Sequence, residues 1–214
     1  MIKIWGRSSA YNVQKVLWTI GELELPYQHI NAGGSVGGLD QPEFLGMNPN
    51  GRIPVIVDDN ITIWESNSIV RYLCAQYSHD WLWAKTPAKR SLAERWMDWE
   101  LATLQPDFLD LFWSFYRTPE ALHDHQKIQN ASERCQKHLA MLDAHLAEQT
   151  FLAGDEFSMG DIPVATSLYR YFEMGIPTPQ IPNVRRWNGA LAERKPYREH
   201  IMTPFDELCG RQTF

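Results

Sequence analysis

The spacing of the apolar residues changes near residue 80 and divides the chain into two kinds of structure. Before that point, Ile2–Trp5 is a short apolar run of strand length, and a second strand is predicted at Tyr27–Ile30. Between these strands, the apolar residues of 13–20 recur at helical spacing. A strand, a helix and a strand joined so closely predict a right-handed βαβ unit with two parallel strands.

A predicted hairpin follows in the first part of the chain. Val55–Val57 and Ile61–Ile63 are strand-like runs that flank Asp59-Asn60, a dipeptide that favours turns. Ser66–Tyr77 then continues as a helix. We therefore expect an α/β first domain over residues 1–79 with the element order βαβ–ββα.

Long helices without strands are predicted beyond residue 80. Pro87 and Pro119 stand behind Thr86 and Thr118, a pattern typical of the first turn of a capped helix. Residues 80–86 are the expected linker. Residues 87–214 are then an all-α helical bundle, and two apolar stripes should face its core: Leu92, Trp96, Trp99 and Thr103, and Cys135, Leu139, Leu142 and Leu146.

Charge and hydropathy narrow the possible partners. The 214 residues hold 20 Lys and Arg against 26 Asp and Glu, so the chain is mildly acidic without a basic stripe. That balance argues against a nucleic acid or an anionic membrane as the main partner. We find no segment of membrane-spanning length and no signal peptide, and we expect a cytoplasmic protein.

Cysteine and histidine give no sign of a disulfide framework or a metal centre. Cys74, Cys135 and Cys209 are far apart and odd in number, and we interpret them as buried small apolar residues. The seven histidines are scattered and lack a carboxylate or cysteine partner at ligand spacing. We therefore expect no bound metal.

Two segments together predict a peptide-binding cradle. In Asn48–Val55, the Ile53-Pro54 pair precedes a strand, where proline leaves the main-chain groups of Ile53 free to pair with an extended ligand. In Trp64–Ile69, polar residues crowd a helix start, where main-chain N–H groups without helical partners favour an anion. The alternative is that Glu65 and Ser66 only cap the helix.

The quoted segments resemble those of the cytosolic glutathione transferase superfamily. Three segments carry the resemblance most specifically: Asn48-Pro-Asn-Gly-Arg-Ile-Pro-Val55, Glu65-Ser-Asn-Ser-Ile69 and Phe157-Ser-Met-Gly-Asp-Ile162. In the last segment, Ser158 and Asp161 also read as a variant of the capping box. The resemblance is to the serine- and asparagine-type members, whether theta-like or beta/nu-like bacterial ones. It implies a thioredoxin-like N-terminal domain, an all-α C-terminal domain, and a cytoplasmic homodimer that acts in detoxification.

The resemblance also implies how glutathione is held as co-substrate. Its cysteinyl main chain would pair with Ile53, and Pro54 would be cis. The Gly-rich stretch Ala32–Leu39 would border the same site. The remaining implied ligands are Arg52 for the glycyl carboxylate, Glu65 and Ser66 for the γ-glutamyl group, and Asn67 in an assisting role. Arg52 could instead be a solvated surface charge.

The residue that stabilises the glutathione thiolate is expected where the first predicted strand meets the first predicted helix. The segment around residues 6–16 resembles the serine and asparagine types more than the tyrosine type, and it contains no cysteine. Ser9 is the first choice, Asn12 follows closely, and Ser8 stays open because the register is ambiguous. Ser8 and Ser9 could also simply cap the helix.

The electrophile is expected at an aromatic cluster in the helical domain. Phe112, Trp113, Phe115 and Tyr116 would line a pocket for a small apolar electrophile, although aromatic residues at helical spacing are more often core. Trp64 and the helix that follows it are the expected dimer contacts.

Three functions are compatible with these residues. The first is conjugation, in which the glutathione thiolate attacks an electrophile. The second is glutathione-dependent reduction of disulfides or peroxides without a catalytic cysteine of the protein's own. The third is non-enzymatic glutathione binding on the same fold, because a fold does not fix a function.

Overall fold

The computed structural model describes residues 1–212, which form two compact units. The N-terminal unit contains Met1–Trp83 together with Pro196–Thr203, and the helical unit contains Ala84–Lys195 and the residues from Pro204 onward. The boundary after Trp83 falls inside the segment predicted as a linker. The return of Pro196–Thr203 to the first unit has no counterpart in the sequence pattern.

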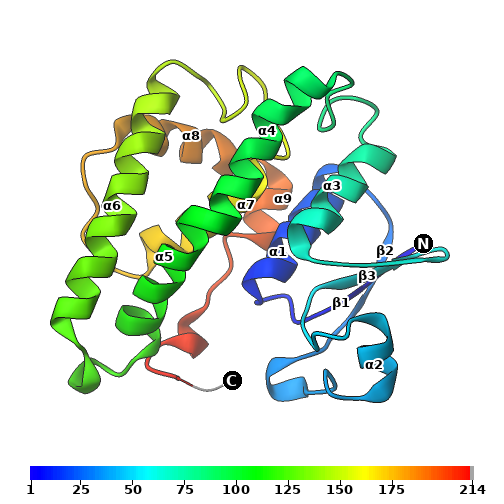
Figure 1. Cartoon of the computed structure of the whole chain (residues 1–214), viewed down its shortest axis with the longest axis horizontal. Helices are drawn as coiled ribbons and strands as arrows, with labels where there is room; N and C mark the ends of the chain where they lie inside the picture. Colours follow the sequence, from blue (N-terminus) through cyan, green and yellow to red (C-terminus); the bar gives the residue numbers. More distant parts are fainter. Residues whose placement is uncertain (213–214) are drawn as a thin grey trace. The chain divides into compact units, whose positions relative to one another are not determined.

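The N-terminal unit is a four-stranded mixed sheet covered by helices (Figure 1). The strand order is β2-β1-β3-β4. Strands β1 and β2 are parallel, as the predicted βαβ unit requires, and β3 and β4 are antiparallel, as the predicted hairpin requires. The pair β1 and β3 is also antiparallel. Helices α1 and α3 lie on one face, and the short helix α2, which the pattern did not indicate, lies on the other. The elements are β1 (Ile2–Trp5), α1 (Tyr11–Glu22), β2 (Tyr27–Ile30), α2 (Pro42–Met47), β3 (Val55–Asp58), β4 (Ile61–Trp64) and α3 (Ser66–Tyr77).

Apolar side chains from α1, α3 and the sheet form one core. Val13, Val16 and Ile20 of α1 pack with Ile69 and Leu73 of α3 among other residues, and all five are fully buried. Each such side chain contributes about 1.5–3 kcal/mol through burial. The core therefore fixes the positions of both helices, and with them the positions of their first turns.

The late segment Pro196–Thr203, which includes most of helix α9 (Lys195–His200), packs on α1. Gln14 Nε2 donates to Thr203 Oγ1 over 2.8 Å, and the rings of Trp18 and Tyr197 meet edge to face at 4.8 Å. Contacts of this kind hold α1 from the side opposite the sheet core. Helix α1, which contains Asn12 and directly follows Ser8 and Ser9, is thus fixed by segments from both ends of the chain.

The helical unit consists of helices and turns, with a single isolated bridge between Phe151 and Gly154 in its described residues. No helix of the described residues combines the length and the apolarity that crossing a bilayer demands. The π-helical segment Glu100–Leu104 joins α4 to α5, and a second one, Phe112–Arg117, continues from the end of α5. The helices are α4 (Pro87–Trp99), α5 (Gln105–Leu111), α6 (His125–Ala147), α7 (Asp161–Glu173) and α8 (Pro182–Ala192).

One predicted helix start is confirmed and the other is wrong. Thr86 caps α4, and Pro87 occupies its first position. Pro119 precedes only a 3-10 turn, and the next helix begins at His125. Its cap is Asp124, whose carboxylate accepts from Lys127 N over 3.0 Å. Asp is at least as favourable as Thr at an N-cap position. The Thr118-Pro119 pair therefore did not identify the true start of the helix.

The two predicted apolar stripes have different outcomes. Cys135, Leu139, Leu142 and Leu146 are all buried, so the stripe on α6 is confirmed. On α4 the prediction is wrong in part, because Leu92 is 38% exposed and Thr103 is also exposed, whereas Ala93 and Met97 are buried. The buried face is centred one residue further along, and the π-helical turn at Glu100–Leu104 shifts the register again.

The cysteine interpretation is right for two residues and wrong for the third. Cys74 and Cys135 are buried, and burial raises the pKa of the Cys135 thiol to about 12. Cys209 is exposed because it follows the short 3-10 turn Asp206–Leu208 near the chain end. Cys209 is not part of a repeating apolar pattern, so the sequence gives no basis for predicting whether it is buried.

Asp161 joins three segments of the helical unit. Its Oδ1 atom accepts from Leu152 N at 3.0 Å and from Trp187 Nε1 at 2.9 Å. Its Oδ2 atom accepts from Ser158 N at 2.8 Å and Ser158 Oγ at 2.9 Å, which is the backward half of the predicted capping box. The hydroxyl of Ser158 accepts from Gly160 N instead of from Asp161 N. Burial raises the pKa of Asp161, and the four donors oppose that rise.

We predict that Asp161→Ala destabilises the protein by about 3–5 kcal/mol, because buried donors lose their only charged acceptor. Urea unfolding followed by circular dichroism measures the change. The exposed neighbour Asp155 provides the control, since Asp155→Ala should change stability by no more than about 0.5 kcal/mol. Equal losses in the two variants would contradict the role of Asp161.

Candidate active site

The strand register places three separate segments at one end of the sheet. Trp5 at the end of β1 pairs with Val55 at the start of β3, and Val55 also pairs with Trp64 at the end of β4. The residues that follow Trp5, precede Val55 and follow Trp64 therefore leave the sheet at the same edge. These are the segments that hold the predicted thiolate, cradle and anion-binding residues.

Gly6 lets the first two segments come into contact. A Cβ atom at this position would lie 2.5 Å from Val13 Cγ2 and 3.3 Å from Ile53 Cβ, and its φ of +148° favours glycine. The main chain of Gly6 is held by β2, since Gly6 N donates to Ile30 O at 3.0 Å and His29 Nε2 donates to Gly6 O at 2.6 Å. Ile53 thus lies directly against the start of the loop that carries Ser8 and Ser9.

Asn48 shapes the loop that leads to Pro54. Its Nδ2 donates to Arg52 O at 2.8 Å, and its Oδ1 accepts from Asn50 N at 3.0 Å. The Ile53-Pro54 bond is cis, as the resemblance implied. Arg52 itself is exposed. The sequence analysis assigns Asn48 no role of its own, although its place at the start of an Asn-Pro-Asn-Gly turn favours such side-chain bonds to the main chain.

Helix α3 begins with a residue in an uncommon conformation. Glu65 occupies the N-cap position with φ +68°, but its side chain forms no hydrogen bond to the helix start. The interpretation that this side chain only caps the helix is therefore wrong. A non-glycine residue in this region costs about 1–3 kcal/mol, and residues strained in this way cluster at functional sites. Ser66 and Asn67 are buried at the first two positions, while Glu65 is exposed.

Helix α1 also begins without a side-chain cap. Its N-cap is Ala10, so neither Ser8 nor Ser9 occupies the cap position. Ser8 is exposed, and Ser9 and Asn12 are partly buried. The Oδ1 atom of Asn12 is buried and has no hydrogen-bond partner among the described residues. A buried acceptor in this state is suited to a donor from a ligand.

The Gly-rich stretch borders these segments, as expected. A Cβ atom on Gly33 would lie 3.2 Å from Ile53 Cδ1, and one on Gly34 would lie 3.0 Å from Arg7 Nη1. Both glycines have positive φ, and Gly33 N donates to Gly37 O at 2.8 Å. The stretch therefore packs against the loop before Pro54 and against the loop before α1.

Asp58, at the end of β3, anchors α3. Its Oδ2 atom accepts from Tyr72 OH at 2.9 Å and from Tyr77 OH at 2.5 Å. Burial and the bond to Asp58 raise the pKa of Tyr72 to about 12. These bonds fix the direction in which the first turn of α3 presents Ser66.

The Tyr72 bond should stabilise the fold fully below pH 10.0, the ordinary tyrosine pKa, and lose this effect as the pH rises toward about 12. We predict that Tyr72→Phe lowers the free energy of unfolding by about 1.5–3 kcal/mol at neutral pH. The gap to the wild type should shrink above pH 10. Urea unfolding at several pH values tests this, and a gap that stays constant up to about pH 11.5 would contradict it.

The four aromatic residues predicted for the electrophile do not form one cluster. Phe112 and Tyr116 stack at 5.2 Å and both contact Phe205. Trp113 lies under the guanidinium of Arg117 instead, and Phe115 packs near His123. Phe112 is buried, so the core alternative holds for that residue. Within the part of the chain that is described, no three His, Cys, Asp or Glu side chains are grouped as metal ligands would be.

Comparison with protein-family models places both units in known families. Residues 7–89 match the model described as Glutathione S-transferase, N-terminal domain. Residues 104–195 match the model described as Glutathione S-transferase, C-terminal domain. The matched ranges together cover most of the chain.

Individual relatives agree with these matches. Glutathione S-transferase GstB of Escherichia coli is 43% identical over 95% of this chain and 99% of its own length. A theta class glutathione S-transferase from Xanthomonas axonopodis pv. citri, solved with glutathione bound, is 44% identical, with a TM-score of 0.90 over 95% of this chain and 98% of that one. Glutathione transferase F2 of Populus trichocarpa is 28% identical, with a TM-score of 0.84 over 94% and 98%.

Proposed function

The chain belongs to the glutathione S-transferase family and is a glutathione-dependent transferase. From this premise we propose that it binds glutathione in the N-terminal unit and activates its thiol as a thiolate. The thiolate then attacks an apolar electrophile. A bond forms between sulfur and the electrophilic carbon, and the leaving group departs with the bonding electron pair or, in an addition, the electrons move into the acceptor.

The observation that carries this proposal is the meeting of three segments at one end of the sheet. Pairing of Trp5, Val55 and Trp64 brings the start of α1, the cis Ile53-Pro54 bond and the start of α3 to one edge. The family model for the N-terminal domain spans all three segments. The Xanthomonas relative was solved with glutathione bound, which supports glutathione as the ligand here.

Each end of glutathione has a proposed partner in this cradle. The γ-glutamyl carboxylate accepts from Ser66 and from the first-turn N–H groups of α3, which no side chain caps. Glu65 faces the ammonium group, and Asn67 assists. The cysteinyl main chain pairs with Ile53, and the exposed Arg52 reaches the glycyl carboxylate.

Thiolate stabilisation requires only a modest energy. A thiol of ordinary pKa, about 8.5, is a few per cent ionised at neutral pH, and lowering that pKa by about two units corresponds to about 2.7 kcal/mol. One hydrogen bond to a charged group supplies about 1.5–3 kcal/mol. A single hydroxyl or amide donor beside the uncapped start of α1 is therefore sufficient.

We assign the donor to Ser9, with Asn12 as the alternative. Both are partly buried, which favours a stronger hydrogen bond than at the exposed Ser8. The buried and unpartnered atom of Asn12 is its acceptor oxygen, which suits a ligand N–H or a neutral S–H better than a thiolate. This supports a positioning role for Asn12 and a donor role for Ser9.

The second substrate and the assembly complete the proposal. We assign the electrophile to the helical unit, and of the predicted set Phe112, Trp113, Phe115 and Tyr116 we retain the half-buried Tyr116, because Phe112 is buried and the other two pack elsewhere. A homodimer is proposed across the edge strand β4, where Trp64 is 37% exposed, together with α3. The proposed setting is the cytoplasm and the proposed role is detoxification, as the resemblance implies.

We predict that Ser66→Ala weakens glutathione binding by about 1–3 kcal/mol, or roughly 5- to 150-fold in Kd. The reason is the loss of a hydrogen bond to the ligand carboxylate. Isothermal titration calorimetry with glutathione measures the change. Ser68→Ala on the exposed face of the same helix is the matched control and should leave Kd unchanged. Unchanged affinity in Ser66→Ala would mean that the cradle is assigned to the wrong residues.

Ser9→Ala should lower kcat at neutral pH by about 10- to 100-fold and shift the rising limb of its pH profile to higher pH, with little change in glutathione affinity. 1-Chloro-2,4-dinitrobenzene serves as the electrophile. Asn12→Ala and Ser8→Ala are measured beside it. If Asn12→Ala shifts the profile and Ser9→Ala does not, the donor is Asn12.

A further inference from the structure

The loop that carries Ser8 and Ser9 leaves β1 through a single glycine. Gly6 directly follows the last residue of β1, is buried and has a φ of +148°. Because glycine has no Cβ atom, its own dihedral angles restrict the peptide that follows only weakly. Contacts from outside the loop must therefore fix the direction in which the chain continues toward α1.

A tight turn follows this glycine directly. Ala10 N donates to Arg7 O at 3.0 Å, so the four residues 7–10 form a turn with Ser8 and Ser9 at its two central positions. Arg7 is joined to Gly6 by one peptide group, and that group is planar and rigid. The orientation of the Gly6–Arg7 peptide therefore contributes directly to where the turn places the Ser9 hydroxyl.

Strand β2 holds Gly6 on both sides. Gly6 N donates to Ile30 O at 3.0 Å, which extends the parallel pairing of β1 and β2 beyond the last register pair, Trp5 and Ile30. Gly6 O accepts from His29 Nε2 at 2.6 Å. A carbonyl oxygen can only accept, so the Nε2 atom carries the hydrogen. The first bond belongs to the main chain of the sheet, whereas the second is made by a side chain and can be removed without breaking a strand pairing.

Loss of the His29 bond would leave an acceptor without its partner at a flexible position. Gly6 is buried, and a buried carbonyl that lacks a hydrogen bond costs free energy. The Gly6–Arg7 peptide would then rotate toward another donor or toward water, and glycine permits that rotation. The rotation would be passed on to the turn that holds Ser9.

We propose that His29 is a positioning residue for thiolate activation. Its Nε2–H holds the Gly6 carbonyl and thereby keeps the turn at residues 7–10 in the orientation in which the Ser9 hydroxyl donates to the glutathione sulfur. In this role His29 acts through the main chain and makes no contact with glutathione or with the reacting atoms. The inference rests on the proposed function, because it adds to the donor role assigned to Ser9.

Two substitutions of similar shape test the inference. In His29→Gln the side-chain amide can still donate to Gly6 O, whereas in His29→Met the side chain has a similar length and no donor. His29 is exposed on the edge strand β2, so neither change disturbs the core. The pKa of the bound glutathione thiol is measured by ultraviolet difference titration, and glutathione affinity by calorimetry.

The removal of the donor should act on the thiol and not on binding. We expect His29→Met to raise the bound-thiol pKa by about 0.5–1 unit and to lower kcat with 1-chloro-2,4-dinitrobenzene at neutral pH by about 3- to 10-fold. The Kd for glutathione should change by less than about twofold. His29→Gln should restore most of the wild-type pKa and kcat.

A double-mutant cycle with Ser9→Ala tests the route of the effect. If His29 acts through Ser9, His29→Met should leave the bound-thiol pKa of the Ser9→Ala protein unchanged. If the two substitutions raise this pKa additively, His29 acts on the sulfur by another route and the inference is wrong.

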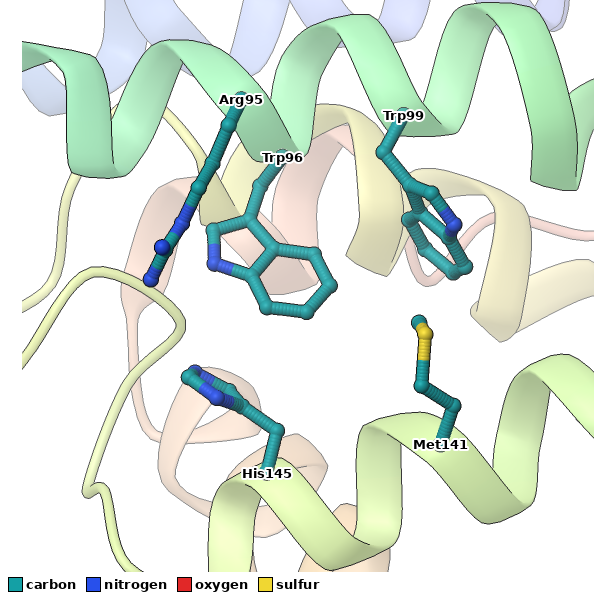
Figure 2. Close-up of a pocket in the computed structure, with 5 residues that line it drawn as sticks. All are labelled: Arg95, Trp96, Trp99, Met141 and His145. Atoms are coloured by element: carbon teal, nitrogen blue, oxygen red, sulfur yellow. The ribbon is translucent and has the colours of Figure 1, made fainter.

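His145 provides a matched control in the helical unit. Its Nε2 atom also donates to a main-chain carbonyl, that of Leu152, at 2.9 Å. Figure 2 shows His145 on α6, across a cavity from Trp96 of α4. His145→Met removes the same kind of bond outside the N-terminal unit and should leave the bound-thiol pKa unchanged. Gln28→Met, at the exposed neighbour of His29 on β2, should also leave it unchanged.

The outcomes separate this inference from the proposed function. An unshifted thiol pKa in the wild-type complex would contradict thiolate activation and, with it, the role of His29. A lowered thiol pKa in the wild type that His29→Met retains would overturn the inference alone. An equal rise in His29→Met and His29→Gln would also overturn it, because the donor would then not matter. Circular dichroism checks that each variant is folded, and His29→Ala replaces His29→Met if the latter does not fold.

Discussion

The antiparallel register through Val55 is the constraint on which the site depends. Because Val55 pairs with both Trp5 and Trp64, three loops that are far apart in sequence must leave the sheet at one edge. The absence of a side chain at Gly6 then allows the first loop to touch Ile53. A shift of one residue in either pairing would turn every side chain to the other face and separate these groups.

The same edge carries two helix starts that no side chain caps. Helices α1 and α3 share one apolar core, so their first turns are held at fixed positions, and Asp58 anchors α3 through two tyrosine hydroxyls. Main-chain N–H groups in the first turn of a helix lack helical partners, which favours an anionic ligand at such a position. The strained φ at Glu65 belongs to the same arrangement, since a fold retains such a residue only where its surroundings enforce it. In this account, binding and thiol activation both use groups that the fold has already oriented.

Local patterns predicted much of this fold correctly, because the four strands, the hairpin and helices α1 and α3 of the first 80 residues follow from short-range spacing, although the short helix α2 does not. The start of a strand after Ile53-Pro54 and the start of a helix at Ser66 were also predictable, since proline and helix-start chemistry are local. Predictions failed where another local signal or a contact distant in sequence determines the structure. The cap of α6 is Asp124 and not Thr118, and a π-helical turn shifts the buried face of α4. Cys209 is exposed near the end of the chain. The packing of Pro196–Thr203 on α1 depends on tertiary contacts that no periodicity reveals.

The most direct test of the account is the pKa of the glutathione thiol in the complex with the wild-type protein. Ultraviolet difference spectra follow thiolate absorbance while the complex is titrated from acid to alkaline pH. The account predicts a bound-thiol pKa about two units below that of free glutathione, as expected for one donor and a helix start acting on the sulfur. Saturating binding with an unshifted thiol pKa would contradict thiolate activation and favour a reductase or a binding protein on the same fold.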